Sequence, residues 1–174
     1  IPFIGVNHLE GHLLPPFLKD PTYAPPENFN YPFLALAVSG GHTSLYLVHD
    51  LGKYEIIGRT KDDAAGEAFD KFAKILGFEF PGGVKIDRLS QTGDPKFVDF
   101  PRGLIDEKTL DMSFSGLKSS GLRYAQSITD EFKNQNINSI CASFQEAIVD
   151  TLVTKLNLAF KKYKVKNVVL TGGV

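Results

Sequence analysis

The sequence has little cysteine, methionine or tryptophan: one Cys, one Met and no Trp among 174 residues. The single cysteine, Cys141, has no partner for a disulfide within the chain, and cysteine-based zinc sites need several thiolates. A disulfide-framed secreted domain and a cysteine-ligated zinc site are therefore excluded, and a reducing, cytoplasmic compartment is expected. Cys141 is expected to be a core residue, because a free cysteine usually packs as a small apolar side chain.

The sequence also lacks an excess of one charge and any long apolar run. Lys plus Arg number 19 against 20 Asp plus Glu, so the net charge of -1 gives no long-range attraction to nucleic acid or anionic lipid. Any contact with nucleic acid must be local. The longest apolar run, 33–38, has six residues, whereas a membrane-spanning helix needs roughly 20. No membrane partner is expected.

The two ends of the sequence are unusual. Residue 1 is Ile, the only methionine is Met112, and Thr-Gly-Gly-Val ends the chain directly after an apolar, strand-like run. A Thr-Gly-Gly turn after a buried strand often opens a loop that binds phosphate. We therefore expect the sequence to be part of a longer protein.

The hydrophobic periodicity predicts an α/β fold. Four segments have the pattern of strands: 33–38, 43–48, 54–59 and 165–170. Five segments have the pattern of helices: 8–14, 65–76, 85–91, 116–128 and 140–160. The first is expected to be the end of a helix stopped by Pro15, and the proline-rich stretch 15–30 a connection. Asp62 or Asp63 is expected to cap the second helix, and Gly77 to end it.

Two of the four histidines, His8 and His12, stand four residues apart. On a helix this spacing places both imidazoles on one face, so they can chelate one metal ion, although two unrelated histidines explain the pattern equally well. A zinc protease needs a glutamate directly after the first histidine. Here the glutamate is Glu10, roughly 200° around the helix from His8, so it points away. A further ligand, expected to be a carboxylate, must come from elsewhere.

Glycine pairs follow two of the predicted strands. Ser-Gly-Gly-His occupies 39–42 between two strands, and Thr-Gly-Gly at 171–173 follows the last strand. Backbone N–H groups of such loops can approach a phosphate closely, but a single Gly-Gly turn is more often a plain hairpin. The two loops together resemble those of actin-like ATPases, which hold a nucleotide between two hairpins.

Three carboxylates, Asp63, Glu67 and Asp70, share one face of the helix predicted at 65–76. Lys71 and Lys74 stand four residues after Glu67 and Asp70. Ordinary helix ion pairs therefore explain this pattern sufficiently.

Six segments form a specific pattern from one end of the chain to the other. They are Asn-His-Leu-Glu-Gly-His (7–12), Val-Ser-Gly-Gly-His-Thr (38–43), Asp-Asp-Ala-Ala-Gly-Glu-Ala-Phe-Asp-Lys (62–71), Phe-Pro-Gly-Gly (80–83), Ser-Phe-Ser-Gly-Leu-Lys (113–118) and Thr-Gly-Gly-Val (171–174). In this order they closely resemble the TsaD (YgjD, formerly Gcp) family, the tRNA threonylcarbamoyladenosine synthases, and more specifically its bacterial branch.

The resemblance implies an actin-like, two-domain α/β fold of the sugar-kinase and heat-shock-ATPase (ribonuclease H-like) type. Residues 1–30 would then be the end of the first actin-like domain and a linker. Residues 31–174 would be the second actin-like domain without its C-terminal portion. About half of the family's chain would be absent.

The resemblance also implies the site residues. His8 and His12 would hold one divalent metal ion, iron or zinc, with an aspartate outside this chain as a third ligand. The residues that match the family's threonylcarbamoyl-AMP site, an adenine-nucleotide site, are Ala37, Val38, Ser39, Gly40, Gly41, Asp70, Gly83 and Asp87. Asp70 and Asp87 would orient hydroxyl groups of the ribose or of the threonyl moiety, and no residue is assigned as a catalytic base.

The implied reaction transfers the threonylcarbamoyl group from threonylcarbamoyl-AMP to N6 of the adenosine 3′-adjacent to the anticodon, in tRNAs reading A-starting codons. The implied partners are the tRNA, the paralogue TsaB as a heterodimer and the ATPase TsaE, while TsaC supplies the donor. Exposed strand edges leave a homodimer open. The chain by itself is expected to have low or no activity.

Three other functions remain open on the sequence. The first is a metal-dependent O-sialoglycoprotein endopeptidase, against which the position of Glu10 argues. The second is a non-catalytic, actin-like interaction module. The third is a small-molecule kinase, which would transfer phosphate from ATP.

Overall fold

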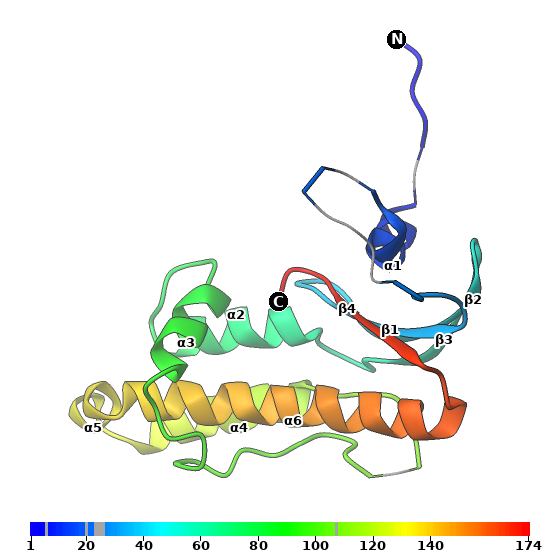
Figure 1. Ribbon diagram of the computed structural model, residues 1–174. Coiled ribbons are helices and arrows are strands. Elements are labelled where there is room, and N and C mark those ends of the chain that lie inside the picture. Colours follow the sequence, from blue (N-terminus) through cyan, green and yellow to red (C-terminus); the bar gives the residue numbers. More distant parts are fainter. Residues whose placement is uncertain (6, 20, 23–26, 107) are drawn as a thin grey trace.

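The computed structural model describes residues 1–5, 7–19, 21–22, 27–106 and 108–174. A four-stranded sheet in the order β3-β2-β1-β4 forms its centre (Figure 1). The strands are β1 (Phe33–Val38), β2 (Thr43–Asp50), β3 (Lys53–Arg59) and β4 (Asn167–Thr171). The first three, all at segments predicted to be strands, form an antiparallel meander, and β4 pairs with β1 in parallel. The prediction of an α/β fold is confirmed.

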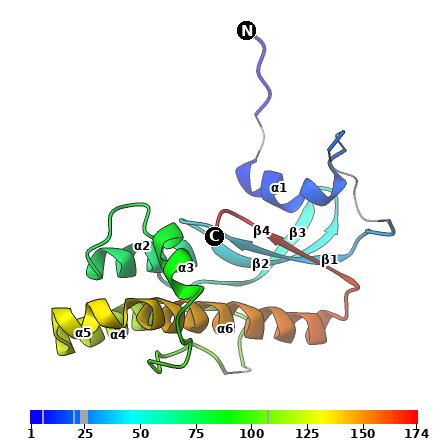
Figure 2. The ribbon, with the colours of Figure 1, turned by 60° about the vertical axis from the view of Figure 1, so that its left-hand side comes forward.

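All five predicted helices are present, some with shifted ends. The described helices are α1 (His8–Leu13), α2 (Ala65–Ile75), α3 (Gly83–Ser90), α4 (Ser115–Ser127), α5 (Asp130–Gln135) and α6 (Ile137–Tyr163), with a 3-10 turn at Pro15–Phe17. The sequence analysis did not anticipate α5. Figures 1 and 2 show α4 and α6 on one side of the sheet and α1 on the other. Among the described residues, no helix combines the length and the apolar character needed to cross a bilayer.

Both faces of β1 are buried, which explains its uninterrupted apolar sequence. Side chains alternate along a strand, so Leu34 and Leu36 join the main core with α2, α4 and α6. Phe33 and Ala35 point to the opposite face and join a smaller core that includes Leu13 of α1. The sheet therefore separates the layer that contains α1 from the layer that contains α6.

A long irregular segment, here called the strap (residues 94–106 and 108–109), lies beside α6. The contacts that tie the strap to α6 include Asp94 N to Ser139 Oγ (3.1 Å), Val98 N to Ser143 Oγ (3.0 Å), Arg102 Nη2 to Asp150 Oδ2 (2.7 Å), and Lys155 Nζ to the carbonyl oxygens of Asp106 (2.8 Å) and Thr109 (2.7 Å). Ser139, Ser143 and Lys155 thereby satisfy backbone groups of the strap that no regular structure pairs, and Arg102 and Asp150 form an ion pair. The strap thereby covers one side of α6.

Three local predictions are wrong. The N-cap of α2 is Ala64 rather than Asp62 or Asp63. Asp62 instead accepts hydrogen bonds at the start of α4, because its carboxylate meets the free N–H groups of that helix. The helix at 8–14 is not the end of a longer one, since the Asn7 side chain caps α1 from outside. Phe160, one of the apolar residues whose spacing predicts the helix at 140–160, was expected to be buried but is 42% exposed.

Gly77 and Cys141 behave as predicted, and one further prediction falls partly outside the described residues. Gly77 follows the end of α2 with a φ of 87°, as expected of a helix-ending glycine. Cys141 is buried. The predicted connection at 15–30 lies outside the described residues at 20 and 23–26.

Candidate functional site

Two glycine loops begin at the same edge of the sheet, because β1 and β4 run parallel and end side by side. Ligands of α/β proteins bind at such carboxyl edges. Gly172 has a φ of 114°, and a side chain there would overlap the Val38 carbonyl. Val174 N donates a hydrogen bond of 3.3 Å to that carbonyl oxygen. The final loop therefore folds back over the end of β1, beside the loop at 39–42.

The start of α2 closes against the first of these loops. Gly66 N donates to Ser39 O at 3.3 Å, and a Cβ on Gly66 would lie 2.8 Å from both Gly40 Cα and Val174 Cγ2. A larger residue at 66 would push the helix away from both loops. Sequence reasoning did not assign Gly66 a role. The sequence signal for this role was a glycine inside the helical pattern of 65–76, because such a glycine often marks a close approach of two backbone segments.

A cavity of about 700 Å³ opens between the glycine loops, α2, α3 and α6. Among the residues that match the family's nucleotide site, five line this cavity: Val38, Gly40, Asp70, Gly83 and Asp87. Three do not appear in the lining: Ala37, Ser39 and Gly41. The volume lies in the range that holds small organic ligands, roughly 300–1,000 Å³.

The three remaining residues of this set have other places at the same edge. The side chain of Ala37 belongs to the small core on the α1 face, because the alternation along β1 directs it away from the cavity. Ser39 closes the turn: its N donates to His42 O at 2.7 Å, and His42 N donates to Ser39 Oγ at 3.0 Å. Gly41 is exposed in that turn. Ser39 and Gly41 therefore shape the loop, and Ala37 packs in the small core.

Asp70 holds the turn that precedes α3. Its Oδ1 accepts hydrogen bonds from Gly82 N at 2.8 Å and Gly83 N at 3.3 Å. The predicted i,i+4 pair is found for Lys71 and Glu67, at 2.7 Å. The ordinary ion-pair explanation therefore holds for Glu67, whereas Asp70 is bonded to the backbone of the Gly-Gly turn.

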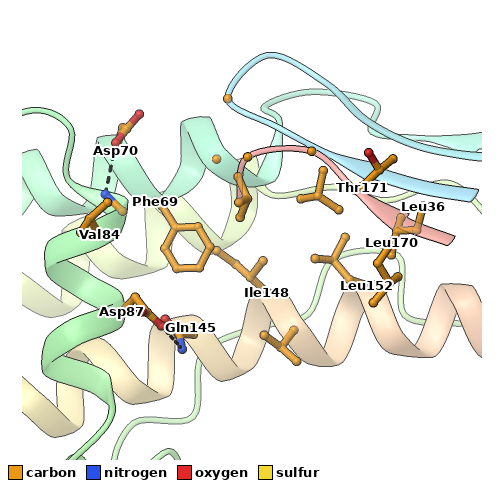
Figure 3. A pocket seen from close by; sticks show the side chains of 18 of the residues that line it. Leu36, Phe69, Asp70, Val84, Asp87, Gln145, Ile148, Leu152, Leu170 and Thr171 are labelled. Atoms are coloured by element: carbon orange, nitrogen blue, oxygen red, sulfur yellow. Dashed lines mark hydrogen bonds between the residues drawn. The ribbon is translucent and has the colours of Figure 1, made fainter. Parts of the chain in front are cut away.

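Asp87 of α3 faces Gln145 of α6 across one end of the cavity (Figure 3). Gln145 Nε2 donates to Asp87 Oδ1 at 3.3 Å. Sequence reasoning missed Gln145, whose only signal was a polar residue next to the apolar stripe of α6. From Ile148 towards Leu170 the wall of the cavity is apolar (Figure 3). Its apolar lining includes Leu36, Ile148, Leu152, Leu156 and Leu170.

The two histidines of α1 converge on one point. His8 Nε2 and His12 Nε2 lie 3.2 Å apart, with His8 exposed and His12 partly buried. Metal–nitrogen bonds of about 2.1 Å place neighbouring ligand nitrogens roughly 3.0–3.4 Å apart, so the pair fits a shared metal ion. Thr171 Oγ1 lies 3.5 Å from His12 Nδ1. This is the other ring nitrogen of His12, which faces away from His8 Nε2. Such an outer contact can fix the tautomer that leaves Nε2 free to bind.

No group of three or more His, Cys, Asp or Glu side chains suited to a metal gathers in the described part of the chain. Asp62 and Asp63 form a separate cluster that does not line the cavity. Burial by itself raises the pKa of Asp63, but Lys118 at 2.7 Å and Lys71 at 2.8 Å outweigh it and hold that pKa below its usual value. Asp63 thus joins Lys71 of α2 and Lys118 of α4 in an ion-pair network, whereas Asp62 accepts hydrogen bonds at the start of α4.

Comparison with known proteins identifies the family. A family model described as TsaD: tRNA N6-adenosine threonylcarbamoyltransferase matches residues 1–174. A protein of that name from Bdellovibrio bacteriovorus is 59% identical over the whole chain, which covers 50% of the relative. Relatives of the same name from Geotalea uraniireducens and Syntrophotalea carbinolica are 49% and 48% identical, and the chain covers 49% of each. The chain thus spans about half the length of the curated relatives it matches, and with its actin-like α/β fold it belongs to the TsaD family.

Proposed function

We propose that the protein transfers a threonylcarbamoyl group from threonylcarbamoyl-AMP to N6 of the adenosine 3′-adjacent to the anticodon in tRNAs that read A-starting codons. One observation carries the proposal. Segments of the family pattern that lie far apart in the sequence, at 38–43, 62–71, 80–83 and 171–174, all contribute to one cavity of about 700 Å³. The names of the relatives support the same reaction.

The cavity has the chemistry that an adenylate needs. Backbone N–H groups of the two glycine loops suit the phosphate, since peptide dipoles can stabilise an anion without a charged side chain. The apolar wall around Ile148, Leu152 and Leu170 suits the flat face of the adenine. Asp70 and Asp87 offer carboxylate oxygens to hydroxyl groups of the donor. Binding and orientation are therefore the roles of these residues.

His8 and His12 hold one divalent metal ion, iron or zinc, in this proposal, and a carboxylate from outside the chain completes the ligand set. When bound, such an ion supplies Lewis-acid polarisation of a carbonyl oxygen. The N-cap Asn7 fixes the start of α1 by accepting hydrogen bonds from Leu9 N at 2.9 Å and Glu10 N at 3.4 Å. This cap keeps both imidazoles on one face of a helix that has only six residues.

The acceptor in this proposal is an amine on a base in a single-stranded anticodon loop, so its presentation needs no opening of a duplex. The net charge of -1 gives no general attraction to the RNA. Docking therefore depends on a local basic surface or on a partner. TsaB as a heterodimer, the ATPase TsaE and the donor-forming enzyme TsaC are the proposed partners, in the cytoplasm, with a homodimer as the alternative assembly.

The test is a transfer assay with preformed threonylcarbamoyl-AMP, anticodon-loop tRNA, TsaB and TsaE. It compares the full-length protein, its His8→Ala and His49→Ala variants, and residues 1–174 alone. His49 is the matched control, because it is half exposed and lies beside Glu55, at 3.7 Å, rather than in the His8–His12 pair.

We expect His8→Ala to lower both transfer and bound metal by about 100-fold or more, while His49→Ala keeps both. Residues 1–174 alone should show little or no transfer. Transfer that survives His8→Ala would refute the proposed metal site. A full-length protein that instead cleaves a sialoglycoprotein or phosphorylates a sugar would refute the proposed reaction.

A further inference from the structure

One polar contact in the cavity has no assigned role. Gln145 Nε2 donates to Asp87 Oδ1 at 3.3 Å, and both residues line the cavity (Figure 3). They lie on different helices, α6 and α3. Asp87 is largely exposed, whereas Gln145 is half-buried. The amide of Gln145 is therefore the more buried partner, and it holds the more exposed carboxylate of Asp87.

The contact uses only one of the two carboxylate oxygens. Within the described residues, no hydrogen bond is recorded to Asp87 Oδ2. A carboxylate only accepts hydrogen bonds, and because Asp87 is exposed, its second oxygen is open to a donor from water or from a hydroxyl group of a ligand. Since glutamine is neutral, it orients Asp87 without neutralising the charge that strengthens such a bond. Gln145 thus keeps Asp87 available as an acceptor.

The packing of α3 against α6 does not require the hydrogen bond between Gln145 and Asp87. Ile86 of α3 is fully buried in the main core, together with Ile140 and Phe144 of α6. These apolar contacts already hold α3 against α6, and a partly exposed bond between neutral and charged side chains adds little to them. The position of the contact in the cavity therefore points to a ligand.

We propose that Gln145 is a positioning residue that orients the Asp87 carboxylate to accept a hydrogen bond from a ribose hydroxyl, so that the site prefers ribonucleotides to deoxyribonucleotides. The inference rests on the proposed function, which places an adenylate in the cavity. The glycine loops take the phosphate and the apolar wall takes the base. The ribose that connects them carries the hydroxyl donors.

The test measures dissociation constants by calorimetry for AMP, 2′-deoxy-AMP, 3′-deoxy-AMP and purine riboside monophosphate, which lacks the N6 amine. The full-length protein is compared with Gln145→Leu, Gln145→Glu and Glu146→Gln. The last is the control, because it changes the neighbouring side chain, which does not line the cavity. Gln145→Glu keeps the size of the side chain, so it remains informative if Gln145→Leu disturbs the fold.

The unmodified protein should bind AMP about tenfold more tightly than at least one deoxy form. A hydrogen bond to a charged acceptor lowers the dissociation constant by about that factor. Both Gln145 variants should reduce this ratio below about threefold. Gln145→Leu should do so by weakening AMP alone, whereas Gln145→Glu adds a negative charge that also weakens all the monophosphates by a common factor, which cancels in the ratio. Glu146→Gln should leave the ratio unchanged. Purine riboside monophosphate should bind like AMP in every variant.

The alternative outcomes separate the two proposals. Equal weakening of AMP and the deoxy forms would show a merely structural role for Gln145 and overturn the inference. Discrimination against the deoxy forms that survives both Gln145 variants, or its absence in the unmodified protein, would overturn the inference as well while leaving the proposed adenylate site intact. Failure of the unmodified full-length protein to bind AMP at all would overturn the inference together with the nucleotide site.

Discussion

Replacing Lys155 by methionine should loosen the strap from α6. Lys155 is 0% exposed, and its Nζ donates to the carbonyl oxygens of Asp106 at 2.8 Å and Thr109 at 2.7 Å. Methionine keeps most of the apolar stem but donates no hydrogen bond. Both carbonyl groups would then lose a partner on the inner side of the strap. The substitution therefore isolates the polar contribution of this contact.

The expected loss of stability follows from two opposing effects. Hydrogen bonds from a charged donor contribute about 1.5–3 kcal/mol each. Burial of the ammonium opposes this contribution, and the same burial lowers the pKa of Lys155 below its usual value. The net loss of unfolding free energy should be about 2–4 kcal/mol. With a urea dependence of roughly 2–3 kcal/mol per M, the midpoint of unfolding should fall by about 1–2 M.

The pH dependence of this difference has a definite sign. Because the pKa of Lys155 is lowered in the folded protein, the unfolded chain binds the proton more tightly. The unmodified protein therefore gains stability as pH rises from that lowered pKa towards about 10.5, and Lys155→Met lacks this gain. The difference between the two proteins should widen as pH is raised.

Urea unfolding followed by circular dichroism measures the effect, with Lys161→Met as the control. Lys161 is exposed on the same helix, so its replacement should change stability by less than about 0.5 kcal/mol. The reasoning would be refuted by a Lys155→Met protein as stable as the unmodified one. A control that loses as much stability as Lys155→Met would refute it equally.

Two further predictions concern buried or capped groups. Asp62→Asn should lower stability by about 1–2 kcal/mol, because Asp62 accepts hydrogen bonds from Ser113 Oγ, Phe114 N and Ser115 Oγ. Burial alone raises the pKa of Asp62, but these bonds outweigh it and lower that pKa, so the difference measured in urea should shrink below about pH 4. Burial raises the pKa of the Cys141 thiol to about 12, so Ellman's reagent should label it only as the chain unfolds, and rapid labelling of the folded protein would contradict this. Since the folded state keeps a proton that the unfolded thiol loses, Cys141 should reduce stability as pH rises above about 8.5.

The long periodic elements were predictable because their signals are local. The apolar residues of α6 recur every four positions, and β1 is a short uninterrupted apolar run, so each pattern needs only its own segment. The N-cap of α2 was mispredicted for the opposite reason. Asp62 has good local cap chemistry, but its partners Ser113 and Ser115 stand 51 and 53 residues away. Tertiary contacts decided how this carboxylate is used.

In the candidate site, too, features with a local sequence signal were predicted, and features that depend on tertiary contacts were missed. The glycine loops and the spacing of His8 and His12 were visible in short segments, and the family resemblance added Asp70 and Asp87. Gln145 was missed because its partner Asp87 stands 58 residues away and no local pattern connects them. Gly66 was missed because its close approach to Gly40 exists only in the folded chain.

The histidine pair and the cavity belong to opposite faces of the sheet, and they meet where β4 ends. Along β4, Val169 faces the small core beside α1, whereas Leu170 lines the cavity on the side of α6. Thr171, the last residue of the strand, lines the cavity and also lies 3.5 Å from His12 Nδ1. At this edge a ligand held on the α6 side can reach a group held by α1, whereas earlier in β4 the sheet lies between the two layers. The parallel pairing of β1 with β4 therefore brings the proposed donor site beside the proposed metal ligands.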